Sequence, residues 1–551
     1  MAVVNENKMS APKEGQEYCD ISKITEKFGR YQVVQFILIC LPAIFVTMIN
    51  INYVFVAGDV NYRCRVEECE GSDPGSTEFY PSWWPNRTID RCSKPVLRDN
   101  MCTNTSFSDK YDICTHWVYE TNNTIIAEHN LACQPWKSNI IGTIHSTGML
   151  ISMLVSGWMS DRFGRKPTLI TCVVLGTIGH LKTFATSYYV YVFIEFLEAT
   201  FTGGSYASAM VILLEISSAK YRLLSGVIFA YAIYLGESLF ACIAMFVPNW
   251  KTLIRIINGP LIFFISYIFI IYESPRWQIV NGKLDKAKES LKRIAETNKI
   301  NIDYNELDEI SDVKLKAKFH VEEFQIEEGY KAIFTSKVIM KRLLVAATTR
   351  FTSNFVYYGL MLNSVWLPGD KYVNFLLSTV MSFPGELICL YMMNRFGRKV
   401  PLIVGFVLCG VVCIICAFIP DVYTWAKISL FLLGKVVIAA CYTGAITYAM
   451  ELFPTSVRGT LIGLGAFASR VGGMLAPLTP ILNTVSTVLP PIFFGGFAVL
   501  SGIAICWTPE TKDMPLFNTI KQVEDSQRVD NSDNKDSRES RQCSETVVSK
   551  I

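Results

Sequence analysis

The chain has 551 residues, of which 51% are hydrophobic and only 18% are charged. Soluble domains carry about 25% charged residues, so this composition favours a membrane protein and excludes a disordered chain or a coiled coil. Lys and Arg number 51 against 48 Asp and Glu, and this near-neutral balance gives no electrostatic surface for nucleic acid.

Twelve apolar runs are long enough to span a lipid bilayer, whose core of about 30 Å takes roughly 20 helical residues. They predict an all-α membrane protein with a cytoplasmic N-terminus (1–30), a six-helix bundle (31–272), a central loop (273–342), a second six-helix bundle (343–507) and a disordered tail (508–551). The expected spans are Tyr31–Val56, Ile140–Met159, Pro167–Phe184, Tyr188–Leu214, Leu224–Phe246, Leu253–Tyr272, Leu343–Leu362, Tyr372–Met393, Leu402–Ile419, Ala426–Tyr448, Leu461–Leu482 and Leu489–Trp507.

A polar segment, 57–139, follows the first span and is expected to lie outside the cell. It holds three Asn-x-Ser/Thr sequons, at Asn86, Asn104 and Asn122, which predict glycosylation. It also holds six cysteines, an even set that suits an oxidising compartment, and their pairing stays open. The disulfide candidates are Cys64, Cys69, Cys92, Cys102, Cys114 and Cys133.

Basic clusters follow the second and eighth spans, at 162–166 and 395–399. The positive-inside rule places such clusters in the cytosol. This orientation agrees with the sequons and cysteines on the other side. The sequence therefore predicts a multi-pass plasma-membrane protein with both termini in the cytoplasm.

Three charged motifs recur in the two halves in the same order and at nearly the same offset. A duplicated six-span unit is typical of a transporter that rocks one half against the other around a central site. The pairs are Asp161–Lys166 with Asn394–Lys399 (394 − 161 = 233), Glu215 and Arg222 with Glu451 and Arg458 (451 − 215 = 236), and Glu273 with Glu510 (510 − 273 = 237).

These motifs resemble a known family. Gly157-x-x-x-Asp161-Arg162-x-Gly164-Arg165-Lys166 is similar to the loop motif of the major facilitator superfamily. Glu451-Leu-Phe-Pro-Thr-x-Val-Arg458-Gly459, with the Cys-rich outer loop, resembles the organic cation/anion/carnitine transporter family. The resemblance covers about residues 18–515 and implies the major facilitator fold, with two pseudo-symmetric bundles. Asn394 departs from the motif's aspartate, so we expect the second half of the gate to be held more weakly.

The resemblance implies that the charged motif residues gate the inner face of the transporter. Charge-assisted hydrogen bonds between neighbouring helix ends would hold a closed gate together, while the alternative is that these charges only set the topology. The expected gating residues are Asp161, Arg162, Arg165, Glu215, Arg222, Glu451 and Arg458.

Charged side chains inside the spans mark the expected substrate site, because intramembrane charge is costly. Glu386 and Arg470 lie near the middle of their spans, so they are the sharpest candidates. Arg470 resembles the span-eleven arginine of the anion and carnitine carriers and would bind a carboxylate, while Glu386 would bind an ammonium group. The alternative is that the two residues only pair with each other. Glu195, Glu198, Arg350 and Lys435 lie near span ends, which favours pairing or snorkelling.

Tyrosines supply the rest of the expected site. Their ring faces suit a quaternary ammonium group, although a single aromatic residue in a span more often packs or lies at the membrane interface. The positions that resemble the family's cavity-lining aromatics are Tyr231, Tyr357, Tyr358 and Tyr442.

The sequence thus predicts a secondary-active transporter of small organic cations or carnitine-like zwitterions that works by alternating access. An organic anion carrier, a sugar porter and a glycosylated cell-surface receptor remain as alternatives. The chain has no Gly-x-x-x-x-Gly-Lys-Ser/Thr loop for ATP, and its five histidines show no metal-ligand spacing. We therefore expect no enzyme activity, cofactor, metal, ATP or nucleic acid partner. Coupling to an ion stays open, with Glu237 and Glu386 as proton candidates.

Overall fold

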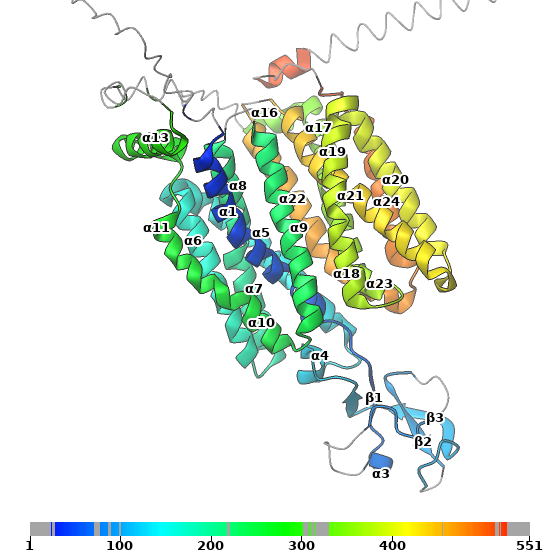
Figure 1. Cartoon of the computed structure of the whole chain (residues 1–551). Coiled ribbons are helices and arrows are strands. Elements are labelled where there is room, and N and C mark those ends of the chain that lie inside the picture. Colours follow the sequence, from blue (N-terminus) through cyan, green and yellow to red (C-terminus); the bar gives the residue numbers. More distant parts are fainter. Residues whose placement is uncertain are drawn as a thin grey trace, which may run out of the picture.

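The computed structural model places two groups of six helical stretches side by side (Figure 1). The residues that it describes are 28–70, 78–85, 90–98, 101–217, 221–300, 330–454, 456–512 and 519–525, with a few single positions between them.

The first half contains six membrane-spanning stretches, several of them built from two consecutive helices, as its apolar runs predict. They are α1 (Arg30–Ile51) with α2 (Tyr53–Val56), α5 (Pro135–Phe163), α6 (Arg165–Leu175) with η2 (Gly176–Phe184), α7 (Tyr188–Thr202) with α8 (Gly204–Ile216), α9 (Arg222–Phe246), and α10 (Trp250–Asn258) with η4 (Gly259–Ser266) and α11 (Tyr267–Ile270).

The second half repeats this order. Its stretches are α17 (Lys337–Asn363), α18 (Lys371–Val380) with α19 (Ser382–Phe396), α20 (Lys399–Phe418), α21 (Thr424–Leu452), α22 (Arg458–Leu475) with η7 (Ala476–Leu478) and α23 (Thr479–Val485), and α24 (Leu489–Ile505). The break between the second and third stretch falls at a glycine with positive φ in each half, Gly164 (φ 120°) and Gly397 (φ 95°). The all-α fold with two six-helix halves is therefore confirmed.

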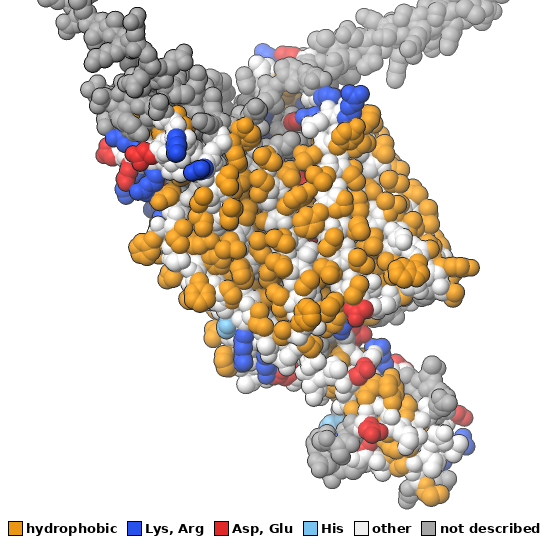
Figure 2. Space-filling view, in the orientation of Figure 1, with side chains coloured by type: hydrophobic (Ala, Val, Ile, Leu, Met, Phe, Trp, Pro, Cys, Tyr) orange, Lys and Arg blue, Asp and Glu red, His pale blue; other side chains and the backbone are white. Residues whose placement is uncertain are grey.

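Length and composition support membrane insertion. Among the described residues, ten helices are long and apolar enough to cross a bilayer. α24 has 17 residues, slightly fewer than the others, and α17 is long but carries four basic residues, at positions 337, 341, 342 and 350. Figure 2 shows a broad hydrophobic surface over the helices, with charged side chains gathered toward the two ends.

A small disulfide domain, residues 59–134, lies at one end of the bundle (Figure 1). Its strands form two antiparallel pairs, β1 (Tyr62–Cys64) with β4 (Trp117–Tyr119) and β2 (Ser93–Leu97) with β3 (Phe107–Ile113). The six predicted cysteines all pair, and the bonds are Cys64–Cys114, Cys69–Cys102 and Cys92–Cys133. Of the predicted glycosylation sites, Asn104 and Asn122 are exposed, and Asn86 lies outside the described residues.

The opposite end, where α5 and α19 finish, carries the charged motifs and is called the motif end below. The central segment there contains α12 (Pro275–Val280), α13 (Leu284–Asn298) and α16 (Tyr330–Thr335). Part of the tail that we expected to be disordered is folded, because residues 520–525 form a short helix. Its Ile520 and Val523, three positions apart on one helical face, are buried against Ile339 and Phe453.

Contacts between the two halves gather toward the disulfide domain. Ser146 Oγ on α5 donates a hydrogen bond to the backbone oxygen of Gly473 on α22 at 3.4 Å. The rings of Phe55 and Tyr372 lie 4.8 Å apart. At the motif end, no hydrogen bond or ion pair joins the two halves within the described ranges. The halves are therefore closed against each other at one end of the bundle.

Candidate functional site

A buried carboxylate, Glu386 on α19, lies where the two halves meet. Its Oε2 accepts hydrogen bonds from Tyr234 of α9 at 3.3 Å and from Thr443 of α21 at 2.7 Å. Its Oε1 is buried and has no hydrogen-bond partner among the described residues. Glu386 Oε1 can therefore accept a hydrogen bond from a further donor.

A second carboxylate, Glu237 on α9, faces the same interface from the first half. Tyr357 of α17 donates to its Oε2 at 3.0 Å, while its Oε1 is buried without a partner in the described part of the chain. Lys435 of α21 lies over the Tyr357 ring, 3.2 Å from the centroid, and its charge interacts with that of Glu237. This group ties α9 of one half to α17 and α21 of the other.

Two arginines, Arg350 on α17 and Arg470 on α22, form a basic part of the site. Their like charges are close enough to repel each other. The Arg350 guanidinium lies 5.6 Å from the Tyr442 ring centroid, and its Nη1 is buried without a hydrogen bond. Arg470 Nη1 lies 4.0 Å from the Sδ atom of Met149 on α5. Neither guanidinium pairs with a carboxylate among the residues that the structure describes.

The predicted tyrosines lie together at this interface. Ring centroids of Tyr357 lie 5.4 Å from Tyr358 and 5.5 Å from Tyr442. Tyr231 donates to the backbone oxygen of Phe383 at 3.3 Å, and their rings lie 5.2 Å apart. The rings therefore form one aromatic cluster between acidic and basic side chains.

Most of the residues predicted for the substrate site lie together in the structure. The proposed mutual pair of Glu386 and Arg470 does not form; their partners are those given above. Tyr234 was missed in the sequence, although it is the residue of the first half that contacts Glu386. Its spacing of three from Tyr231 and from Glu237, which puts all three on one helical face, was the available signal.

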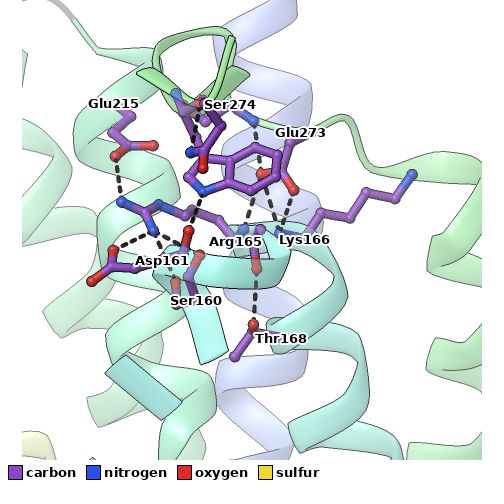
Figure 3. A network of polar contacts seen from close by, with 11 residues as sticks. Ser160, Asp161, Arg165, Lys166, Thr168, Glu215, Glu273 and Ser274 are labelled. Atoms are coloured by element: carbon purple, nitrogen blue, oxygen red, sulfur yellow. Dashed lines mark hydrogen bonds and ion pairs between the residues drawn. The ribbon is translucent and has the colours of Figure 1, made fainter. Parts of the chain in front are cut away.

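Figure 3 shows the first charged motif at the motif end. Arg165 Nη1 lies 2.6 Å from Asp161 Oδ1, and its Nη2 lies 3.3 Å from Glu215 Oε1 on α8. The backbone N–H groups of Arg165 and Lys166, at the start of α6, donate to Glu273 Oε1 at 3.1 and 3.3 Å. The network joins α5, α6, α8 and the segment after α11 within one half.

The second half contains the same arrangement. Arg398 Nε lies 3.2 Å from Glu451 on α21, and Thr511 donates to the same carboxylate at 2.6 Å. Backbone N–H groups of Arg398 and Lys399 donate to Glu510 at 2.8 and 3.0 Å. The repeated sequence motifs thus form repeated networks.

Three predicted gating residues do not join these networks. Arg162 lies over the Trp158 ring at 5.5 Å, Arg222 is exposed, and Arg458 donates to the backbone oxygen of Phe453. Their proposed gating role thus has no ion pair behind it among the residues that the structure describes. The acids Glu215 and Glu451 instead contact Arg165, the first residue of α6, and Arg398, the residue just before α20.

Sequence reasoning did not assign a gating role to Glu273 and Glu510, although both motifs were noted. Burial raises the pKa of the Glu273 carboxyl, despite backbone hydrogen bonds that lower it. Burial also acts to raise the pKa of Glu510, but four backbone N–H groups hold it below its usual value. Each carboxylate receives the N–H groups at a helix start, a favourable place for negative charge.

Two halves of six helices around a polar interface define a multi-pass membrane transporter of the major facilitator type. The chain belongs to the sugar (and other) transporter family, whose model matches residues 104–521.

Curated relatives extend the match over nearly the whole chain. The "Organic cation transporter protein" of Drosophila melanogaster is 29% identical and the alignment covers 92% of this chain and 94% of that protein. "Solute carrier family 22 member 3" of Mus musculus is 28% identical, with 90% and 94% covered. "Organic cation transporter 1" of Caenorhabditis elegans is 27% identical, with 90% and 86% covered. The resemblance to organic ion transporters is thereby confirmed.

Solved structures support the fold alone. The partially occluded inward-open conformation of the xylose transporter XylE from E. coli matches with a TM-score of 0.59 at 15% identity, covering 88% of this chain and all of that one. XylE bound to 6-bromo-6-deoxy-D-glucose matches with a TM-score of 0.59 at 16% identity, covering 88% and 98%.

Proposed function

We propose that this chain is a plasma-membrane carrier that moves small organic cations or carnitine-like zwitterions by alternating access. The observation that carries the proposal is the division of charge at the interface between the halves. Glu386 and Glu237 each keep a buried oxygen without a partner, while Arg350 and Arg470 pair with no carboxylate in the described residues. A zwitterion would place its ammonium group at the acids and its carboxylate at the arginines.

The tyrosine cluster supports a bulky organic substrate. Lys435 already lies over the Tyr357 ring and Arg350 near the Tyr442 ring. Tyr358 is therefore the ring that we assign to a quaternary ammonium group, a contact that gains about 0.5–2 kcal/mol. A sugar site needs amides and few charges, so the charged interface disfavours a sugar porter. The names of the organic cation transporter relatives agree with this substrate class. The two neighbouring arginines favour an organic anion as the second candidate.

Closure at the disulfide end supports alternating access, because a substrate at the interface would then exchange with the motif end. The Arg165 and Arg398 networks lie within single halves, so we assign them the role of keeping each half rigid as it moves. The proposed orientation puts both termini in the cytoplasm. Three disulfide bonds and the exposed sequons at Asn104 and Asn122 support an extracellular disulfide domain. The proposal includes no catalytic activity, no ATP and no nucleic acid partner.

The test is uptake of labelled carnitine, tetraethylammonium and an aromatic carboxylate into cells that display the protein, with surface labelling to correct for expression. Wild-type protein should carry carnitine or tetraethylammonium above the background of untransfected cells. Arg470→Asp should lower carnitine uptake by about tenfold or more, the loss of roughly 1.4 kcal/mol or more of binding, and spare tetraethylammonium. Arg470→Lys keeps the charge and is the matched control.

Two results would count against the proposal. If Arg470→Asp leaves the preference for substrate charge unchanged, the assigned site is wrong. If none of the three probes is carried and glucose is carried instead, the sugar porter is the better description.

A further inference from the structure

A buried cluster of charged side chains lies inside the first half, away from the candidate substrate site. Lys182 Nζ on η2 lies 2.7 Å from Glu195 Oε2 and 2.5 Å from Glu198 Oε2, both on α7. Glu195 Oε1 lies 2.7 Å from His145 Nδ1 on α5. All four side chains are at most 1% exposed. Asn258 of α10 donates to Glu198 Oε1 at 2.9 Å and completes the cluster.

The charges of this cluster balance only if it binds one extra proton. With Lys182 protonated, both glutamates ionised and His145 neutral, the net charge is −1. An uncompensated buried charge is costly. One further proton, on His145 or on Glu195, makes the cluster neutral. From their place near a span end we expected Glu195 and Glu198 to pair with other groups or to snorkel, and their partners are Lys182 for both and His145 for Glu195.

The hydrogen bonds around His145 place the extra proton. Nδ1 faces the Glu195 carboxylate, and Nε2 lies 3.1 Å from Asn50 Oδ1. Asn50 uses its Nδ2 to donate to the Tyr206 hydroxyl at 2.8 Å, so its Oδ1 is an acceptor. A neutral imidazole has only one N–H. Both contacts can be hydrogen bonds only if the ring carries two protons or if Glu195 carries one.

A path of hydrogen bonds leads from this proton toward the candidate substrate site and ends at Tyr206. It runs from Glu195 through His145 and Asn50 to Tyr206 of α8. The charges of Glu237 and Arg470 both act on the Tyr206 hydroxyl. For the proton to affect the substrate, a change of protonation at His145 must alter the orientation of Tyr206, which lies between the proton site and the residues that we assign to the substrate.

The elements packed around the proton site contribute few other titratable groups among the residues described. The Tyr53 ring lies 5.9 Å from the His145 ring, and Tyr191 lies 5.9 Å from Lys182 Nζ. The groups are Tyr53 from the first membrane-spanning stretch, His145 from α5, Lys182 from η2, Tyr191, Glu195 and Glu198 from α7, and Tyr206 from α8, with His129 and Tyr188 next to Tyr191.

The same turn of α5 that carries His145 also touches the other half. Ser146 Oγ donates to the backbone oxygen of Gly473, and Thr147 Oγ1 lies 3.2 Å from Met474 Sδ. These contacts belong to the closed end of the bundle. A change in the charge of His145 therefore acts next to a surface that must separate when the halves rock.

We propose that His145 and Glu195 bind one proton whose binding and release are coupled to transport of the organic ion. The inference rests on the proposed function, because transport is its main readout. A pH gradient of one unit is worth about 1.4 kcal/mol per proton. One coupled proton can therefore change substrate accumulation by up to roughly tenfold.

The experiment uses the purified full-length protein in liposomes, with the membrane potential clamped at zero. Uptake of labelled carnitine or tetraethylammonium is measured with and without an imposed pH gradient of one unit. Wild-type protein should respond by up to about tenfold, and the sign distinguishes proton symport from exchange. His145→Gln should carry the probe without responding to the gradient. His180→Gln is the control. His180 lies on η2, like Lys182, but outside the cluster, so this variant should respond to the gradient as the wild-type protein does.

Uptake that ignores the gradient in wild-type protein, or a gradient response that survives in His145→Gln, would overturn the proposal. A second readout does not depend on the substrate. In the nitrogen NMR spectrum of histidine-labelled protein, the signals lost in His145→Gln should titrate in one step. If these signals stay constant between about pH 5 and pH 10, the proton site is absent even when no probe is carried. If the NMR signals change with pH but no probe is taken up, the result contradicts the proposed function and leaves the proton site in place.

Discussion

Arg165 and Arg398 hold equivalent positions in the two halves, 233 residues apart (398 − 165 = 233), but only Arg165 has a carboxylate four residues before it. Asp161 lies 2.6 Å from Arg165 Nη1, whereas the matching position before Arg398 is Asn394. Both arginines also contact a glutamate of a neighbouring helix. Among the described residues, the network around Arg165 thus has one ion pair more than the network around Arg398.

Asp161→Asn removes this additional pair. The Asp161 side chain is 78% exposed, so we expect a loss of at most about 0.5 kcal/mol in the free energy of unfolding. Because only the part of this energy that differs between the open and closed forms counts, the balance between them shifts by at most about twofold. The maximal uptake rate should change by a similar factor, while KM and substrate preference stay the same. Initial uptake rates over a range of substrate concentrations measure both quantities.

Asn394→Asp is the reciprocal variant and supplies the control. It places a carboxylate four residues before Arg398 and should shift the maximal rate in the opposite direction. A change in substrate preference in either variant would contradict the assignment of these residues to the motion rather than to the site.

Gly164→Ala should destabilise the folded protein by more than about 1 kcal/mol. Gly164 has a φ of 120°, and an added Cβ would clash with Glu273 Oε2, which belongs to the carboxylate that receives the first N–H groups of α6. The thermal unfolding temperature of detergent-purified protein measures the effect. Gly157→Ala in α5 is the matched control, since a Cβ there meets no atom within 4 Å and alanine favours a helix. Equal unfolding temperatures for the two variants would contradict the prediction.

Hydropathy and repeated motifs were sufficient to predict the arrangement of two six-helix halves, because a bilayer imposes helix length and apolar composition. Partners of charged groups were less predictable. Glu215 lies seven residues before Arg222 in the chain, but it contacts Arg165, since tertiary packing sets α6 beside α8. The sequence alone therefore did not indicate which basic residue of the motifs each acid contacts.

Lys182 shows a second limit of sequence reasoning. It falls inside an apolar run whose average hydropathy conceals one charge, and it was not counted among the intramembrane charges. Its partners Glu195 and Glu198 lie on the next helix, 13 and 16 residues later. Only the packing of η2 against α7 brings the three side chains together. A basic residue buried in an apolar run was the signal available.

Glu237 and Lys435 should depend on each other for stability. Both side chains are at most 1% exposed. Their charges interact although no direct ion pair joins them among the described residues, so we expect removal of one charge to cost less than the about 3–5 kcal/mol of a direct buried pair. We expect Lys435→Met to lower the unfolding temperature, and the double variant Glu237→Gln with Lys435→Met to recover most of the loss. If the losses of the two single variants simply add in the double variant, the two charges are not a pair.

The stability of the disulfide domain should come more from its three disulfide bonds than from its hydrophobic core. Its strands have only three to seven residues and bury little apolar surface. Replacing both Cys69 and Cys102 by Ser should destabilise this domain by about 2–5 kcal/mol and reduce delivery to the cell surface. Peptide mapping by mass spectrometry without reduction checks the pairing directly. Replacing Cys409 by Ser is the control, because this buried cysteine of α20 forms no disulfide. Normal surface delivery of the double variant, or peptides joined in another pairing, would show that the domain is held together differently.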